Sequence, residues 1–472
     1  MSILNAKSVE QLQLTNIKNL STITPNLFSA DPGDGRNVIS IRGIATTSYD
    51  PTVAVNIDGV NQFSLDTYIP ELFDIERIEI LKGAQSTLYG SDAIGGVINI
   101  VTKKGQKGPP RWVFRTEGGS YGTFSNKLGV SGATEDTSYN IALSQFHSDG
   151  FQRIGYRIGR LAYLNPNGVD PITRLGGSAK VSKQINDWLT FETGFNMSRE
   201  RLQYDSGPYS EDMLAPNPQV GVLTTAYQKA IAENGAFRTT LTTFETKVHR
   251  DMWLYTKDSV YGDTNAHYIY NGTRLGAELQ EDVKLGPYGT LSAGARYEGE
   301  KAAGDEDGAT YDKRQTTRSA FVLHQINLFE KLHLSSGGRI DDISGSGSFA
   351  TYRATVAYDL TDSTRLRASY GTGAKAPSLY QLYVPAYNNP SLKSETSRGY
   401  DVGIEQSFLA GDARLSANYF SNKIDNLIVG DPLTWIPYNV AKATISGVEL
   451  SSEYNLMPNW ARLKSAYTLL ET

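Results

Sequence analysis

The sequence predicts a transmembrane antiparallel β-barrel that follows a small mixed α/β domain. Two observations support this fold class. Segments of alternating polar and apolar residues recur from Trp112 to the C-terminus, whereas the residues before Lys103 vary in pattern. The connections between the alternating segments are short and long in turn, as they are in barrels of bacterial outer membranes.

The composition excludes several classes of protein. The 472 residues include 45 basic and 50 acidic side chains, and the resulting net charge of −5 argues against a nucleic-acid-binding protein. Cysteine is absent, which leaves no disulfide framework, no thiolate metal site and no cysteine nucleophile. No stretch approaches the ~18 consecutive apolar residues of a membrane-spanning helix, but the alternating strands of a β-barrel need no such run.

The α/β domain is predicted to span residues 1–108. It ends where the sequence Lys-Lys-Gly-Gln-Lys-Gly-Pro-Pro (103–110) interrupts both the helical and the strand periodicity. Apolar periodicity predicts a helix over 9–20, and a second short helix is expected over 70–74. Short apolar runs predict strands, and Asp58-Gly59 marks a turn between two of them. The expected strands cover 38–42, 53–57, 78–81 and 96–101.

Residues 109–472 repeat a two-residue period that predicts strands. Within 351–360, Tyr352, Val356 and Leu360 lie on one face, and Arg353 and Asp359 lie on the other. We count roughly seventeen or eighteen such segments, too many for one β-sandwich. Charged faces indicate a wet or plugged lumen, and Tyr and Trp near strand ends indicate a membrane interface. Further clear examples are 188–197, 365–370, 414–419 and 446–453.

The lengths of the connections predict two different rims. Tight turns are expected at 359–363 and 410–412, and long loops at 204–234, 302–313 and 376–398. Tight turns on one rim and long loops on the other are typical of an outer-membrane barrel, and long loops commonly carry recognition.

A glycine-rich stretch raises the question of a nucleotide site. Gly90 and Gly95 have the spacing of a phosphate-binding loop, but Gly96 and Val97 stand where that loop needs a lysine and a hydroxyl. The residues after the glycines predict a strand instead of the helix that a nucleotide site requires. We therefore interpret the glycines as positions of tight bends and close backbone contact, at Gly83, Gly90, Gly95 and Gly96.

The same region resembles the plug domain of TonB-dependent outer-membrane receptors, of the siderophore-receptor type. The resemblance rests on four stretches of the first domain: Ile41-Arg-Gly-Ile44, Val55-Asn-Ile-Asp-Gly-Val60, Ile75-Glu-Arg-Ile-Glu-Ile-Leu-Lys-Gly83 and Thr87-Leu-Tyr-Gly-Ser-Asp-Ala-Ile-Gly-Gly-Val-Ile-Asn-Ile-Val-Thr102. Later segments are also similar to this family: Leu366-Arg-Ala-Ser-Tyr-Gly-Thr-Gly-Ala-Lys-Ala-Pro-Ser-Leu379, Asn389-Pro-Ser-Leu-Lys-Ser-Glu-Thr-Ser397 and Ile445-Ser-Gly-Val-Glu-Leu450.

The resemblance implies that residues 1–108 form a plug domain and residues 109–472 a transmembrane β-barrel that the plug fills. Barrels of this family have about 22 strands, so the lower strand count predicts that C-terminal strands are missing. A signal peptide and the energy-coupling segment are expected before the plug, and neither precedes Ser2. We therefore expect a chain that is truncated at both ends.

The resemblance also implies a function. We expect TonB-dependent active uptake of a ferric siderophore across the outer membrane of a Gram-negative bacterium, by a monomer that works with TonB, ExbB and ExbD. The expected protein has no cofactor, no enzymatic activity and no nucleic-acid partner. A receptor for cobalamin or another metal chelate is the alternative, and a passive porin is a third hypothesis that the folded N-terminal domain disfavours.

Several charged residues of the first domain are expected to anchor it to the wall and to rearrange on transport. They are Arg42, Glu76, Arg77 and Glu79, and the expected partners are lumen charges such as Arg367, Glu405 and Glu449. Lys82 stands where the family often has arginine, so a bidentate contact is not expected there. The competing interpretation is that these are solvated surface charges.

Ligand contacts are expected on two loops of the first domain that the resemblance places below the binding site. Aromatic residues beside a polar partner suit a siderophore, and the candidates are Tyr49, Gln62, Phe63 and Tyr68. The alternative is that these side chains pack the domain against the wall.

No metal or catalytic site is expected. The acidic loop around Asp305 and Asp312 has oxygen ligands that calcium could use, but a solvated loop tip is the simpler interpretation. Haem receptors of the resembled family carry a histidine between segments that correspond to 377 and 389, and this chain has none there. No Ser/His/Asp set or carboxylate pair stands in a hydrolase-like context.

Overall fold

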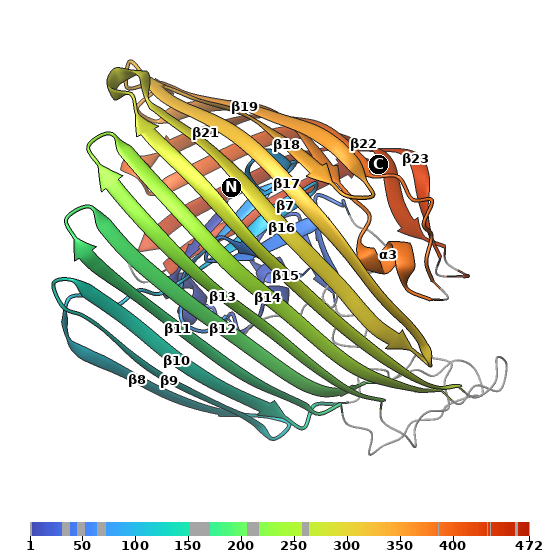
Figure 1. Ribbon diagram of the computed structural model, residues 1–472. Coiled ribbons are helices and arrows are strands. Elements are labelled where there is room, and N and C mark those ends of the chain that lie inside the picture. The colour runs from blue at the N-terminus through green and yellow to red at the C-terminus, as the bar shows by residue number, and fades with distance from the viewer. Residues whose placement is uncertain are drawn as a thin grey trace.

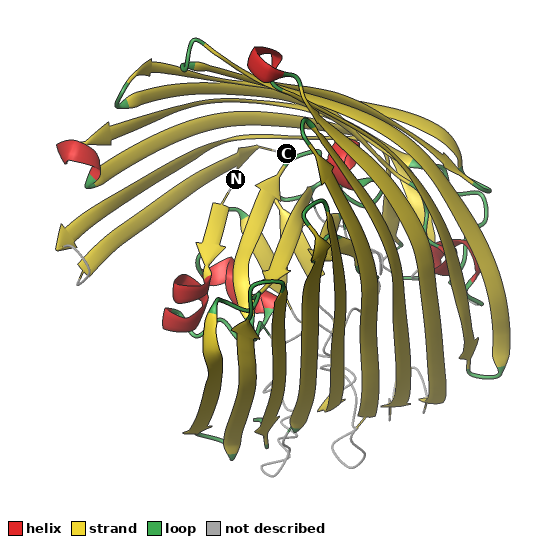
Figure 2. Cartoon of the chain, turned by 60° about the vertical axis from the view of Figure 1, so that its left-hand side comes forward, coloured by secondary structure: helices red, strands yellow, loops and turns green. Residues whose placement is uncertain are grey.

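The computed structural model describes residues 2–30, 38–44, 52–63, 72–151, 170–204, 217–256, 264–385, 387–431, 433–434, 436–457 and 461–471. Its strands form two assemblies: a large antiparallel wall and a small domain that the wall surrounds (Figure 1). Figure 2 shows the wall curving around the small domain, which we call the inner domain. Among the described residues, no helix is both long and apolar enough to cross a lipid bilayer.

The inner domain is built on a five-stranded sheet with the order β1-β6-β7-β4-β5. Strands β4 and β7 pair in parallel and the other neighbours are antiparallel. Ile41, Ile78 and Ile100 are fully buried in its core. Its elements are β1 (Ser2–Asn5), α1 (Ala6–Gln11), the 3-10 helix η1 (Ile17–Thr22), β2 (Leu27–Ala30), β3 (Val38–Ile41), β4 (Val53–Ile57), β5 (Val60–Asn61), β6 (Ile75–Lys82), α2 (Ser86–Tyr89) and β7 (Gly96–Thr102).

The single helix expected over 9–20 is wrong, because α1 and η1 are separate. Asn16 explains the break: its side chain accepts from the backbone of Asn19, and the Asn19 side chain accepts in return from the backbone of Asn16. Such a capping box starts a new helix and competes with continuation of the old one. The helix expected over 70–74 lies partly outside the described residues, and 72–74 are not helical.

The glycine-rich stretch has the structure that the sequence predicted. Gly90 follows α2 with a φ of 84°, a conformation that glycine adopts without strain. A Cβ atom on Gly96 would lie 2.5 Å from the Leu81 carbonyl oxygen and 2.7 Å from Ile41 Cδ1, so β6 and β7 can pair here only because Gly96 has no side chain. The residues that follow form β7 and no nucleotide-binding helix.

The wall contains 17 strands in the described part of the chain, and each pairs with the next. Strands of up to 21 residues exceed the ~9–11 residues that cross a bilayer, so the wall extends beyond the lipid. The strands are β8 (Gly108–Gly119), β9 (Thr123–Ala133), β10 (Thr137–Ser148), β11 (Ile172–Asn186), β12 (Leu189–Tyr204), β13 (Asn217–Asn234), β14 (Phe237–Thr256), β15 (Thr264–Lys284), β16 (Thr290–Glu306), β17 (Ala309–Leu328), β18 (Leu332–Ile343), β19 (Gly347–Thr361), β20 (Thr364–Lys375), β21 (Glu395–Phe408), β22 (Ala413–Gly430), β23 (Pro437–Met457) and β24 (Ala461–Glu471).

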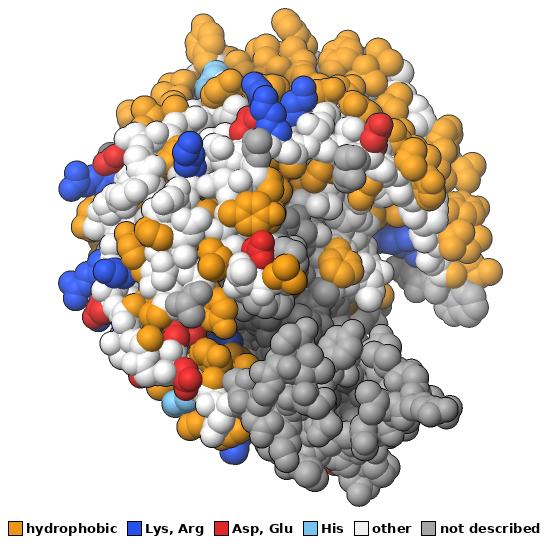
Figure 3. All heavy atoms as spheres, turned by 90° about the vertical axis from the view of Figure 1, so that its right-hand side faces the viewer, with side chains coloured by type: hydrophobic (Ala, Val, Ile, Leu, Met, Phe, Trp, Pro, Cys, Tyr) orange, Lys and Arg blue, Asp and Glu red, His pale blue; other side chains and the backbone are white. Residues whose placement is uncertain are grey.

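The two predicted faces of the wall strands are confirmed. On β19, Tyr352 and Tyr358 are exposed on the outside, whereas Arg353 points inward and donates to the Ala84 carbonyl oxygen of the inner domain at 2.6 Å. Exposed tyrosines of neighbouring strands stack on the outside, with 5.9 Å between the ring centroids of Tyr352 and Tyr370. Figure 3 shows hydrophobic side chains gathered along the top and right-hand edges of one view.

Two of the expected long loops are wrong. The turn between β16 and β17 spans only residues 307–308, because cross-strand pairing continues to Glu306 and Ala309. Residues 217–234 form β13. Their alternation is weak in the sequence because buried lumen positions such as Asn217 and Thr225 are polar. The expected tight turns at 359–363 and 410–412 are confirmed. The long connection expected over 376–398 lies between β20 and β21, carries the short helix α3 (Leu379–Tyr383), and ends at Glu395, where β21 begins.

Candidate functional site: contacts between the inner domain and the wall

Arg42 joins the inner domain to the wall through two ion pairs. It follows β3 in a turn with a φ of 58°, and its side chain is only 4% exposed. The guanidinium Nη2 lies 2.7 Å from Asp401 Oδ1 on β21 and 3.2 Å from Glu449 Oε2 on β23. Its Cζ lies 4.1 Å from the centre of the Phe420 ring on β22. One side chain therefore holds three neighbouring wall strands.

Glu449 collects further donors from the inner domain. Lys82 Nζ donates to its Oε1 at 3.0 Å, and Asn26 Nδ2 donates at 2.7 Å. We call the six side chains the Arg42 cluster: Asn26, Arg42, Lys82, Asp401, Phe420 and Glu449. The cluster joins residues beside β2 and β3 and at the end of β6, all in the inner domain, to the wall strands β21–β23.

Burial acts in opposite ways on the two cations of the Arg42 cluster. For Arg42, burial alone would lower the pKa, but the charges of Asp401 and Glu449 outweigh it and raise the pKa above its ordinary value. For Lys82, burial is stronger than the attraction of Glu449, and the pKa lies below its ordinary value. Arg42 is therefore the better-compensated charge of the two.

The other predicted anchor residues contact each other. Arg77 Nη1 lies 2.9 Å from Glu76 Oε1, and Arg77 Nε lies 2.6 Å from Glu79 Oε1. Asn99 donates to the second oxygen of Glu79 at 2.9 Å. Arg77 is 39% exposed, so this group lies on the surface of the inner domain. Of the expected wall partners, the structure brings Glu449 to Arg42, while Glu405 lies 3.4 Å from Arg414 on the wall itself.

Asp58 is the centre of a second, more deeply buried polar contact. It occupies the first position of the two-residue turn between β4 and β5, with φ of 51° at Asp58 and 88° at Gly59. Such a hairpin turn favours Asp-Gly. Asp58 Oδ1 lies 2.8 Å from Lys180 Nζ on β11, and both side chains are under 10% exposed. Thr102 donates to Asp58 from its backbone N–H at 3.0 Å and from its hydroxyl at 2.7 Å.

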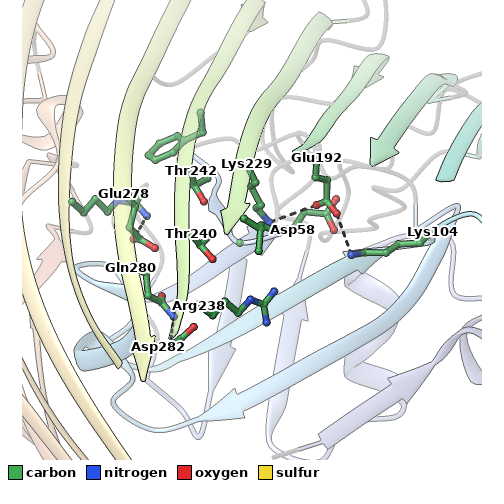
Figure 4. Close-up of a pocket in the computed structure, with 14 residues that line it drawn as sticks. Asp58, Lys104, Glu192, Lys229, Arg238, Thr240, Thr242, Glu278, Gln280 and Asp282 are labelled. Carbon is green, nitrogen blue, oxygen red and sulfur yellow. Dashed lines mark hydrogen bonds and ion pairs between the residues drawn. The ribbon is translucent and has the colours of Figure 1, made fainter. Parts of the chain in front are cut away.

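Neighbouring wall residues extend this contact. Lys229 Nζ on β13 donates to the Asp58 carbonyl oxygen at 3.0 Å, and the Tyr227 hydroxyl lies 3.2 Å from Glu192 Oε1. Lys104, in the connection from β7 to β8, lies 3.1 Å from Glu192 Oε2. Figure 4 shows Asp58, Lys104, Glu192 and Lys229 converging. We call this set the Asp58 network: Asp58, Lys104, Lys180, Glu192, Tyr227 and Lys229.

A cavity of about 330 Å³ lies directly beside the Asp58 network. Its lining comes from the inner domain on one side and from β12–β16 on the other, and it carries charges of both signs (Figure 4). The lining residues include Asp58, Gly59, Lys104, Glu192, Lys229, Arg238, Thr240, Thr242, Glu278, Gln280, Asp282 and Arg296.

Two of the four predicted ligand-contact residues are described, and both are buried against the wall. The Gln62 side-chain oxygen accepts from the Thr225 hydroxyl at 2.7 Å. The Phe63 ring lies below Arg274 of β15, with 4.8 Å from Cζ to the ring centre, and packs with Leu379 of α3. This is the packing arrangement that the sequence left open as an alternative. Tyr49 and Tyr68 lie outside the described residues.

The acidic hairpin around Asp305 has ordinary partners. Asp305 Oδ1 accepts from the backbone N–H of Gly308 at 2.6 Å, and Asp312 lies 2.8 Å from Lys301 Nζ. Among the described residues, no group of three or more acidic or histidine side chains is arranged to hold a metal ion.

The fold and these contacts define a class of protein: a membrane β-barrel whose lumen holds a separately folded domain through polar contacts. Residues 112–472 match the family model for the TonB-dependent receptor-like β-barrel, and residues 1–97 match the TonB-dependent receptor plug domain. The chain belongs to the TonB-dependent receptor family. The inner domain is the plug of that family, whose members are outer-membrane receptors and transporters and not enzymes, and carry no cofactor.

Individual relatives show how far the similarity extends. The chain is 26% identical over 470 residues to a vitamin B12 transporter of Photobacterium profundum, covering 96% of this chain and 73% of the relative. The ferric enterobactin receptor of Pseudomonas aeruginosa has a TM-score of 0.81 at 19% identity, covering 99% of this chain and 79% of that chain. The ferric yersiniabactin uptake receptor of Yersinia pestis has a TM-score of 0.77 at 20% identity, covering 100% and 78%.

The sequence-based search for site residues missed the Asp58 network. Asp58-Gly59 was interpreted only as a turn, and its wall partners Lys180, Glu192 and Lys229 carry no motif. The available indication was the alternation itself, which places Lys180 and Lys229 on lumen-facing positions of their strands.

Proposed function

We propose that the chain mediates TonB-dependent active uptake of a ferric siderophore across the outer membrane of a Gram-negative bacterium. The observation that supports this function best is the Arg42 cluster, which holds the inner domain in the lumen by charged hydrogen bonds. Water can replace such contacts when the domain moves, so they suit a plug that must be released and reseated.

In the proposed cycle the chelate binds from outside, above the inner domain. A monomeric receptor then engages TonB, which is driven by ExbB and ExbD, and the pull rearranges the inner domain. Arg42 anchors the domain until that step, and Glu76, Arg77 and Glu79, which contact one another in this structure, rearrange when the domain moves. Gln62 and Phe63, with Tyr49 and Tyr68, contact the chelate. Because Gln62 and Phe63 are buried in this structure, their contact with a chelate requires the inner domain or α3 to shift.

The test is growth of a receptor-deleted strain that carries the full-length gene. Ferric enterobactin, ferric yersiniabactin and other ferric siderophores are supplied in turn as the iron source, and cyanocobalamin is supplied to a strain that depends on it. We expect rescue by at least one ferric siderophore, and loss of that rescue when TonB is also deleted. Rescue by no iron chelate would refute the siderophore assignment.

Cobalamin is the second candidate ligand. The vitamin B12 transporter of Photobacterium profundum supports it through 26% identity along nearly the whole chain, whereas the siderophore receptors support siderophore uptake through the fold. Rescue by cyanocobalamin alone would decide for this candidate.

A further inference from the structure

We propose that the cavity beside the Asp58 network is a preformed exit for the transported solute and that the Asp58 network is the latch that closes it. This inference rests on the proposed function and adds the side of the inner domain on which passage occurs. We call this cavity the exit cavity. Its location, its lining and the contacts that close it support the proposal.

The exit cavity lies in the half of the lumen that is bounded by tight turns. Arg238 follows the hairpin between β13 and β14, and Asp282 lies near the end of β15, before the short connection to β16. In outer-membrane barrels the rim with tight turns faces the periplasm. The cavity is therefore on the side to which a solute must be delivered.

The lining of the exit cavity is mostly polar and of mixed charge. Acidic and basic side chains face it in equal numbers, so no single charge dominates, and Ile231 and Phe244 are its apolar members. A solute that leaves through such a space exchanges water for polar side chains and does not have to wet a dry surface. The charged residues are Asp58, Glu192, Glu278 and Asp282, and Lys104, Lys229, Arg238 and Arg296.

The latch is polar and borders the exit cavity. Asp58 is held to the wall by Lys180, Lys229 and Tyr227. The apolar contact on this side is that of Val60 with Tyr227 and Phe244, and water from the adjoining cavity can replace the wall partners of Asp58.

The opposite side of the inner domain combines the Arg42 cluster with apolar packing. There, Ile44 and Ile94 pack against Phe420 and neighbouring wall residues, all nearly fully buried. Opening that side breaks the ion pairs of Arg42 and also exposes hydrocarbon to water at roughly 25 cal/mol per Å².

The latch is also close to the proposed ligand contacts. Asp58 and Gln62 belong to the same β4–β5 hairpin segment, and Gln62 contacts Thr225 on the wall strand β13, which also carries Tyr227 and Lys229. A displacement of this hairpin breaks both contacts together. Events at Gln62 are therefore transmitted to the latch through a few residues of one chain segment.

The test uses potassium ions as the probe and needs no chelate. The full-length receptor and its Asp58→Ala variant are inserted into planar lipid bilayers in potassium chloride, and the conductance is recorded. Two single cysteines are added in turn to the Asp58→Ala variant: Thr240→Cys, in the wall of the exit cavity, and Ser416→Cys on β22. Ser416 contacts Ser451 in the same half of the lumen and lies outside the cavity lining. These 472 residues contain no cysteine, so each added thiol is unique among them.

We expect Asp58→Ala to conduct severalfold more potassium than the unsubstituted receptor. A negatively charged methanethiosulfonate reagent should abolish most of this added conductance with cysteine at 240 and change it little with cysteine at 416. An unchanged conductance in Asp58→Ala overturns the latch. An equal block at both cysteines overturns the route, because it indicates that the whole inner domain has been displaced.

Asp58→Asn separates loss of the charge from loss of folding. Asparagine keeps the side-chain shape and tolerates the positive φ of this turn, while it removes the negative charge. Folding of every variant is checked by its heat-dependent mobility on gels. If Asp58→Ala does not fold, the same expectations and the same refuting outcomes apply to Asp58→Asn. The conductance result stands whether or not any siderophore is taken up, so failure of this inference is distinguishable from failure of the proposed function.

Discussion

Arg42 holds the inner domain to three neighbouring wall strands. Its guanidinium contacts two partly buried wall carboxylates at once and covers an aromatic ring, and its own side chain is buried. Arginine suits this position better than lysine because its planar fork can reach two carboxylates in fixed directions. The consequence can be tested against a charged residue of the same domain that makes no described contact with the wall.

Arg42→Ala should destabilise the docked inner domain by about 1.5–3 kcal/mol, because two partly buried carboxylates lose the charged hydrogen bonds of Arg42, while Glu449 keeps those of Lys82 and Asn26. Urea-dependent protease access to the inner domain, measured in detergent-solubilised receptor, reports this change. The matched control is Arg77→Ala, whose half-exposed ion pairs are worth about 1 kcal/mol or less. Equal losses in the two variants would contradict the role of Arg42.

Asp74 gives the docked state a pH dependence. Burial raises the pKa of Asp74 above its ordinary value, and its hydrogen bonds from Ser178 and Asn140 of the wall oppose burial only in part. The docked domain then binds the proton more tightly than the released one. The contribution of Asp74 to docking is therefore fully present below the ordinary aspartate pKa of about 3.9 and is lost as the pH rises through the raised pKa.

Asp74→Asn should remove this dependence. The amide oxygen can still accept from Ser178 and Asn140, and asparagine tolerates the φ of 66° at this position. We expect the variant to be more stably docked than the unsubstituted receptor at neutral pH, and the difference to shrink toward acid pH. A difference that stays constant with pH in the same protease assay would show that Asp74 does not titrate with docking.

At the scale of elements, the contact between β6 and β7 leaves no room for a side chain at Gly96. Gly96→Ala places a Cβ atom against the Leu81 carbonyl and Ile41, so we expect a loss of about 1–3 kcal/mol or more in the stability of the inner domain. Gly299→Ala in β16 is the matched control, since a Cβ atom there has nothing within 4 Å. Urea titration of both variants by circular dichroism measures the loss, and a neutral Gly96→Ala would refute the close contact.

At the scale of the whole molecule, the inner domain and the wall should unfold separately. The wall strands are linked by continuous backbone pairing, whereas polar contacts and small apolar clusters hold the inner domain. All 5 tryptophans lie after position 108, so tryptophan fluorescence reports on the wall alone. We expect protease access to the inner domain at a lower urea concentration than the fluorescence change, and coincident transitions would contradict independent unfolding.

Much of this architecture could be predicted from the sequence because it depends on local patterns. The alternation that places Tyr352 outside and Arg353 inside is a property of neighbouring residues, and so is the Asp58-Gly59 turn. Part of the loop expected over 204–234 was mispredicted because buried lumen positions of β13, such as Asn217 and Thr225, are polar and weaken the alternation. The loop expected over 302–313 was mispredicted because cross-strand pairing continues to Glu306 and Ala309. The break at Asn16 depends on two side chains that cap each other.

The candidate site was less predictable because it is made of distant pairs. Arg42 was expected to reach the wall, but its contact with Asp401 joins residues far apart in the chain, and no local pattern specifies that pairing. The same holds for Asp58 and Lys180. Glu76, Arg77 and Glu79 have the same residue types as true wall contacts, yet their strand directs them to one another.

The edge position of β1 has a mechanical consequence. This strand pairs with β6 through only four residues, from Ser2 opposite Ile80 to Asn5 opposite Arg77, and it has no partner on its other side among the described strands. A load that arrives from the N-terminal side reaches these few hydrogen bonds before it reaches β6, β7 or either polar cluster. The strand is therefore the first element to detach under load. Its detachment lengthens the chain by up to ~3.4 Å per residue and limits the force that reaches the rest of the domain while it detaches.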